Sequence, residues 1–192
     1  MLVSNVCHLG IVKANFLVYL LTRQLVNFFT MTTTNWNATA FFQNLTAHNK
    51  FATAHSFVFA RVSGLEGFEE ALAQMQSSTA FVCVSDTSQG YIALDNTPRT
   101  RRVKTVFFCM RHAVEDIEAR QECMDTMREL FRQFMSKLIL EKTRLEQSCI
   151  YLDERISFNE IDKYFASGCA CAYFQIAVDT FTDLRFNADE WE

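Results

Sequence analysis

The chain has 192 residues, of which 49% are hydrophobic and 21% are charged, and its formal net charge is −4. This length suits one domain of ~100–200 residues, and the composition excludes a disordered chain. The acidic balance excludes a chain-wide positive field of the kind that attracts nucleic acid or anionic membranes. With 19 phenylalanines, 5 glycines and 1 proline, the sequence predicts bulky apolar packing between long, uninterrupted elements.

Residues 1–30 are mostly apolar and form an N-terminal extension to a single domain over residues 31–192. The uncharged run Ala14–Thr22, which Lys13 and Arg23 flank, is shorter than the ~20 residues that a membrane-spanning helix needs. The segment also lacks the basic start and small-residue cleavage site of a signal peptide. Two interpretations remain: translation naturally begins at Met31, or the extension is an apolar helix that packs on a partner.

In the first part of the domain, the sequence predicts two helices with a strand between them. From Thr34, apolar side chains recur at helical spacing, with Thr34 or Asn35 as the N-cap. The alternating, Phe- and Val-rich stretch Thr53–Ser63 predicts a strand. Residues 64–78 return to three- and four-residue apolar steps, which predicts the second helix.

Strands follow in the middle of the chain. Two apolar runs, Thr79–Val84 and Tyr91–Leu94, flank a polar turn and predict an antiparallel hairpin. Residues Arg101–Arg111 alternate at first and then become continuously apolar, which is typical of a strand that enters a buried sheet.

The longest predicted element is a helix over Val114–Gln147, a segment without Gly or Pro. One face carries a broad apolar stripe, which indicates packing on a sheet rather than a narrow coiled-coil seam. The residues of this stripe are Ile117, Met124, Met127, Phe131, Phe134 and Leu138.

In the C-terminal part of the chain, the sequence predicts two or three further strands. A strand at Cys149–Leu152 is followed by a charged turn, then by a short strand or helical turn before Gly168, and finally by a strand from Cys169 to about Phe181. Short connections between successive strands favour an α+β fold, with a mainly antiparallel sheet packed against the long amphipathic helix and shorter helices.

The seven cysteines are odd in number and scattered, which is typical of reduced thiols. Cys169 and Cys171 are the one close pair, and without a second pair or a nearby histidine a metal site is not favoured. Their spacing follows from strand alternation. Ala170, Phe174 and their neighbours are predicted on one wholly apolar face that meets the long helix, and the two thiols on the other face, which becomes polar along its length and is open to solvent or a partner. Catalytic and phosphate-binding motifs are absent from the sequence, so we expect no enzyme activity and no cofactor.

A basic stretch comprises Arg99, Arg101, Arg102 and Lys104. Alternation predicts Arg102 and Lys104 on one strand face and Arg101 on the other. The stretch suits a local contact with nucleic acid or an acidic partner, but charge that protects a strand edge from mispairing is favoured in this acidic chain.

The C-terminal segment "DLRFNADEWE" is the strongest candidate for an interface. It carries Phe186 and Trp191, and is therefore more apolar than a fraying terminus usually is. We expect it to dock on its own domain or on a neighbouring subunit.

The order of elements from about Thr34 to Trp191 resembles that of small virion proteins of tailed phages and prophages, of the tail-completion or tail-terminator type. The resemblance rests on the strand "VKTVFFCM", the long helix, and the returning strands "CIYLDERISF" and "CACAYFQIAVDTFTDL". It implies a structural role, ring-like self-association, other virion or assembly proteins as partners, and no catalysis. The long helix exceeds the length expected from the resemblance.

Three function classes follow. The first is a structural assembly protein of a phage, prophage or mobile element, located in the host cytoplasm or the virion, without a membrane partner. The second is a small intracellular ligand-binding or adaptor domain with an apolar pocket between helix and sheet. The third is an enzyme, which would need Cys, His and carboxylate groups to converge in a cleft.

Overall fold

The computed structural model describes residues 36–63, 67, 78–86, 88–94, 98–113, 116–161 and 168–191, which all belong to one compact unit, Asn35–Glu192. The extension over residues 1–30 and nearly all of the predicted helix 64–78 lie outside the described residues. The elements are α2 (Ala38–His48), α3 (Lys50–Ala54), β1 (Phe57–Val62), β2 (Ala80–Ser85), β3 (Gln89–Ala93), β4 (Arg99–Arg111), α5 (Ile117–Gln147), β5 (Ile150–Leu152), β6 (Phe158–Ile161), β7 (Cys169–Phe181) and a 3₁₀ turn, η1 (Ala188–Glu190).

The seven strands form one sheet in the order β1-β2-β4-β7-β5, with β3 also paired to β4 and β6 also paired to β7. All the pairs are antiparallel except β1 and β2, which run parallel. The prediction of an α+β fold with a mainly antiparallel sheet is confirmed. The parallel pair was not predicted, because it depends on where the chain returns after Ser63 and not on any local pattern.

The predicted hairpin between Thr79–Val84 and Tyr91–Leu94 is wrong. β2 and β3 do not pair with each other; they lie one after the other along the same edge of β4, β2 against Val106–Met110 and β3 against Arg99–Val103. The polar residues between them interrupt a strand instead of reversing it. Both runs find their hydrogen-bond partners on the long strand β4, a solution that local turn chemistry does not reveal.

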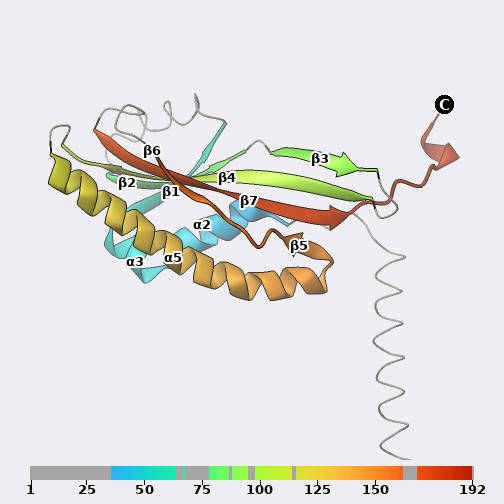
Figure 1. The fold of residues 1–192 in the computed structure, drawn as a ribbon, viewed down its shortest axis with the longest axis horizontal. Coiled ribbons are helices and arrows are strands. Elements are labelled where there is room, and N and C mark those ends of the chain that lie inside the picture. The colour runs from blue at the N-terminus through green and yellow to red at the C-terminus, as the bar shows by residue number, and fades with distance from the viewer. Residues whose placement is uncertain are drawn as a thin grey trace, which may run out of the picture. The chain divides into compact units, whose positions relative to one another are not determined.

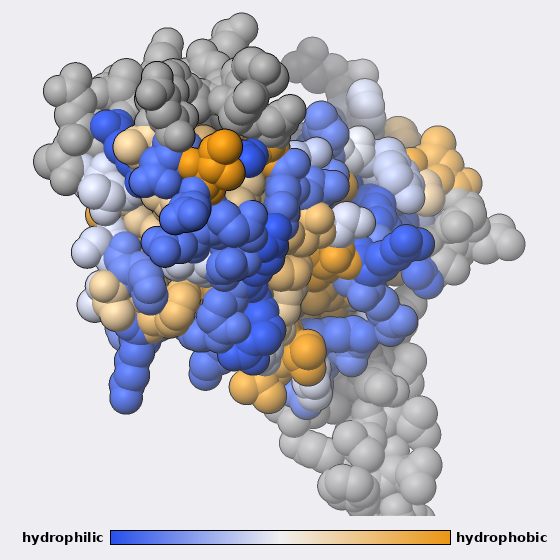
Figure 2. All heavy atoms as spheres, turned by 60° about the vertical axis from the view of Figure 1, so that its left-hand side comes forward, coloured by the Kyte–Doolittle hydropathy of each residue, from blue (hydrophilic) through white to orange (hydrophobic). Residues whose placement is uncertain are grey.

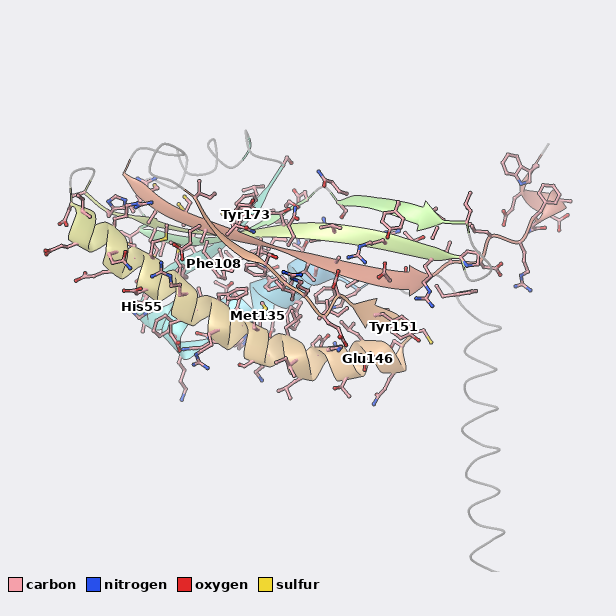
Figure 3. All side chains as sticks on the ribbon, in the orientation of Figure 1. His55, Phe108, Met135, Glu146, Tyr151 and Tyr173 are labelled. Carbon is pink, nitrogen blue, oxygen red and sulfur yellow. The ribbon has the colours of Figure 1, made fainter. Side chains whose placement is uncertain are left out.

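The helices α2, α3 and α5 all lie on one face of the sheet (Figure 1). Alternation along β4 and β7 places Phe108 and Phe174 on this face, and their ring centroids are 5.4 Å apart. Phe134 of α5 packs against Phe108, and Phe42 of α2 packs against Phe174. Figure 3 shows Phe108 between the sheet and α5. The predicted packing of the apolar β7 face against the long helix is confirmed.

The helix α5 begins later than predicted and its buried stripe differs in part. Asp116 is the N-cap, and its side chain accepts a hydrogen bond from the backbone N–H of Ala119. Ile117 was predicted in the stripe but is 81% exposed, since the first turn extends past the sheet contacts. Leu130 and Leu145 are buried instead, while Phe131 is half-buried and packs against Phe158 and Phe174.

The first predicted helix and strand also need correction. Asn37, and not Thr34 or Asn35, is the N-cap of α2, accepting a hydrogen bond from the N–H of Ala40. Asn49 ends this helix and caps α3, so Thr53 and Ala54 are helical. The strand β1 therefore starts at Phe57, after Ser56, whose φ of 56° is left-handed.

The opposite face of the sheet carries a second, smaller apolar cluster. Its buried members are Val62, Phe81, Cys83, Phe107, Cys109 and Cys171. Tyr173 packs on this cluster, on the side away from α5 (Figure 3). The prediction of an open face is therefore wrong at this end of β7, where Cys171 is 1% exposed, although Gln175 further along is exposed. In the described part of the chain, no helix combines the length and apolar character needed to cross a membrane.

Candidate functional site

The C-terminal segment after β7, Thr182–Trp191, is an arm that extends away from the sheet (Figure 1). It exposes large apolar side chains: Phe186 is 76% exposed, Trp191 is 71% exposed, and Leu184 is also exposed. Phe186 and Trp191 stack on each other, with ring centroids 6.3 Å apart. The arm is thus a small apolar unit that is mostly in solvent, and the docking of this segment on its own domain is not observed.

The arm is also acidic. Asp183 forms an ion pair with Arg185 at 2.5 Å, so that the one basic side chain of the arm is neutralised within it. Asp189 and Glu190 directly precede Trp191 and lie in the turn η1, where both are exposed. The end of the arm therefore presents carboxylates beside an exposed aromatic ring.

A pocket of about 390 Å³ opens between the start of α2 and the helix-side face of the sheet. Arg102 and Lys104 contribute from β4, and their cross-strand partners on β7, Val178 and Ile176, form the apolar wall. The remaining lining residues are Trp36, Asn37, Ala38, Thr39 and Ser88. Two cations beside an aromatic ring and two aliphatic side chains suit a ligand that is both acidic and apolar.

Lys104 is held in the pocket wall by two backbone carbonyl groups, one from the last residue of β2 and one from the residue that follows it. Its ammonium group donates hydrogen bonds to the backbone carbonyl oxygens of Ser85, at 2.9 Å, and Asp86, at 2.6 Å. Burial lowers the pKa of Lys104, and the nearby Asp86 carboxylate partly opposes this effect. The break in the strand thus positions one of the two cations.

Arg101 lies on the other face of β4, as alternation predicted, and forms an ion cluster there. Its guanidinium donates to Asp179 on β7, at 3.0 Å, and to Asp153 after β5. The hydrogen bond that Arg101 donates to Asp153 raises the pKa of Arg101. The hydrogen bonds that Asp153 accepts from the backbone N–H of Arg155 and from Arg101 lower the pKa of Asp153. This ion cluster joins three segments of chain, so Arg101 has a clear structural role.

The predicted basic patch is therefore divided by the sheet. Arg99 and Arg101 lie on the outer face, with the Arg99 guanidinium 6.0 Å from the centre of the Tyr151 ring, while Arg102 and Lys104 lie in the pocket. β4 is paired on both sides here, with β3 and with β7, so the interpretation as edge protection is wrong.

Sequence reasoning missed the contribution of Trp36, Ile176 and Val178 to a site. Alternation along β4 and β7 predicts on which face of the sheet each of their residues lies. Only the register of the two strands, which sets Arg102 opposite Val178, shows that these two residues meet. Among the described residues, no group of three or more His, Cys, Asp or Glu side chains is arranged to hold a metal ion.

The fold and the site define an α+β protein with a mixed seven-stranded sheet, a helix-covered face, a basic pocket on that face and an acidic aromatic arm. No protein-family model and no curated protein matches the sequence.

Proposed function

We propose that the protein is a structural subunit that self-assembles, with the C-terminal arm of one copy seated in the basic pocket of the next. The observation that carries this proposal is the complementarity of the two surfaces within one chain. The arm offers Trp191 beside Asp189 and Glu190, and the pocket offers Arg102 and Lys104 beside an apolar wall. The arm supplies negative charge and the pocket supplies positive charge, while both supply apolar contact.

Large exposed aromatic side chains support the role of the arm in this contact. Buried Trp and Phe side chains are the usual energetic anchors of protein interfaces, and they are costly to leave in water. The part of the surface visible in Figure 2 is mostly hydrophilic, with small, separate apolar patches. The arm adds to the exposed apolar side chains of this unit a pair of aromatic rings that stack on each other.

A contact between the arm of one copy and the pocket of another is heterologous, because it joins two different surfaces. Such contacts propagate from copy to copy and produce closed rings or open filaments. A ring subunit is the role that the resemblance to tail-completion and tail-terminator proteins implies, with other virion proteins as partners. Capsid or tail genes beside its gene would support that more specific role.

The test is the oligomeric state of the full chain, measured by light scattering after gel filtration over a range of concentrations. We expect a defined oligomer for the wild type, and a monomer for Trp191→Ala and for Arg102→Glu. Lys137→Glu, the same change of charge sign at an exposed position of α5, is the control and should assemble normally.

A charge-exchange variant makes the test specific to this pairing. As a single substitution, Glu190→Arg should disrupt assembly. The double variant Glu190→Arg with Arg102→Glu should assemble in part, because two opposite charges then face each other again with their signs exchanged. A wild-type protein that stays monomeric at high concentration would refute the proposal. Variants that assemble as well as the wild type would show that other surfaces are used.

The pocket itself favours a second function, that of a small ligand-binding or adaptor domain. A volume of about 390 Å³ falls within the ~300–1,000 Å³ range of small-molecule sites. This function predicts a monomer that carries a small acidic ligand, which native mass spectrometry of the purified protein would detect as an added mass. Loss of that mass in Arg102→Glu would assign the ligand to the pocket.

A further inference from the structure

Four cysteines from three neighbouring strands meet on the sheet face opposite α5. Cys109 of β4 is directly opposite Cys171 of β7, and their Sγ atoms are 3.0 Å apart. Cys169 lies two residues before Cys171, and Cys83 of β2 belongs to the same buried cluster. Cys83, Cys109 and the Cys169/Cys171 pair are far apart in sequence, so the pairing of the strands brings these three segments together.

The four thiols differ sharply in their access to solvent. Cys83 and Cys109 are fully buried and Cys171 is 1% exposed, whereas Cys169 is half-buried. A reagent that comes from solvent therefore reaches the sulfur of Cys169 first. Cys109 lies behind it, within hydrogen-bonding contact of both Cys169 and Cys171.

The surroundings favour the thiolate form at Cys169. The hydrogen bond that Cys109 donates, together with the positive charge of Arg111 on the neighbouring strand, lowers the pKa of Cys169 below that of an ordinary thiol. Burial raises the pKa of Cys83 to about 12, and hydrogen bonding and burial raise that of Cys109. Cys123 of α5 is a further thiol within electrostatic reach of Cys169, and its pKa is raised, chiefly by burial.

We propose that Cys169 is a site of reversible oxidation by peroxides, and that it passes the oxidation inward to a disulfide between Cys109 and Cys171. The geometry supports each part: one accessible sulfur, a contacting thiol behind it, and a cross-strand pair at 3.0 Å. Directly opposite residues of an antiparallel pair have Cα atoms ~4.5–5.5 Å apart, a separation that a disulfide accepts.

The chemistry balances in three steps. The Cys169 thiolate attacks a peroxide oxygen, so an S–O bond forms, the O–O bond breaks and hydroxide leaves, taking up a proton to become water. The sulfur of Cys109 then attacks the sulfenic acid, forming an S–S bond and releasing a second water. Finally Cys171 attacks Cys109 by thiol–disulfide exchange, which returns Cys169 to its thiol. Two thiols have lost two electrons, and one peroxide has been reduced to water.

The experiment treats the folded full-length protein with hydrogen peroxide, blocks the remaining thiols and maps disulfides by peptide mass spectrometry. We expect a disulfide between Cys109 and Cys171 that dithiothreitol reverses. Cys169→Ser should slow its formation at least tenfold. Cys109→Ala should leave Cys169 as a sulfenic acid that dimedone traps. Cys149→Ser, at a half-buried thiol outside the cluster, is the control and should behave like the wild type.

A second measurement needs no variant. Iodoacetamide should label Cys169 before the other three cysteines of the cluster, with a rate that begins to rise at a lower pH than theirs. The proposal is overturned if peroxide produces no disulfide at Cys109, if Cys169→Ser forms the disulfide as fast as the wild type, or if labelling of Cys169 is no faster than that of buried thiols.

Discussion

The replacement Phe174→Ala tests the packing between the sheet and the helices α2 and α5 that cover one of its faces. Phe174 is fully buried on β7, and its ring lies 5.0 Å from that of Phe131, 5.4 Å from that of Phe108 and 5.8 Å from that of Phe42. It therefore contacts α5, β4 and α2 at once. Loss of a buried phenylalanine costs about 3–5 kcal/mol, through lost transfer energy and the cavity left behind.

We expect the upper half of that range, about 4–5 kcal/mol, because the three rings come from separate elements and cannot all move into the cavity. The assay is urea unfolding followed by circular dichroism, at a concentration where the wild type and the variant have the same oligomeric state. Phe186→Ala is the matched control, since this exposed ring on the arm should change the unfolding free energy by less than about 0.5 kcal/mol. A cost below about 1.5 kcal/mol for Phe174→Ala would refute the packing described here.

Three further predictions concern single positions. A Cβ at Gly90 would lie 2.0 Å from the carbonyl oxygen of Arg101, so Gly90→Ala should destabilise the protein by about 1–3 kcal/mol in urea unfolding; an unchanged midpoint would contradict the close approach of β3 to β4. Asp116→Ala removes the N-cap of α5 and should cost about 0.5–2 kcal/mol, whereas Asp116→Asn should cost less. The lowered pKa of Asp153 means that its stabilising effect is complete above its unfolded pKa of ~3.9 and is lost as the pH falls through the lower folded value. The stability gap between the wild type and Asp153→Asn should thus narrow in acid, and a gap that is equal at pH 7 and pH 3 would rule out this contribution.

The sequence by itself was enough to predict the elements whose signal is local. The long helix follows from its three- and four-residue apolar steps and the lack of Gly and Pro, and α5 spans 31 residues within the predicted segment. The apolar face of β7 follows from two-residue alternation in the same way, as does the placement of Arg102 and Lys104 on the face opposite to Arg101. The periodicity of side chains along one segment determines which face of that segment is buried.

Only the tertiary structure decided which strands pair, because pairing depends on segments distant in the chain. The polar residues after β2 look like a hairpin turn, yet β4 offers enough length for both β2 and β3, and the chain continues along its edge. The parallel pairing of β1 with β2 is likewise independent of any local turn signal.

The same reason explains the candidate sites. The ion cluster of Arg101 needs carboxylates 52 and 78 residues further along the chain, and the pocket needs α2 beside Ile176 and Val178. Cys109 and Cys171 are 62 residues apart and meet because thirteen consecutive residues of β4 and β7 pair in one register. Local periodicity determined the face on which each of these side chains lies, and the long-range hydrogen bonding of the sheet determined which side chains meet there.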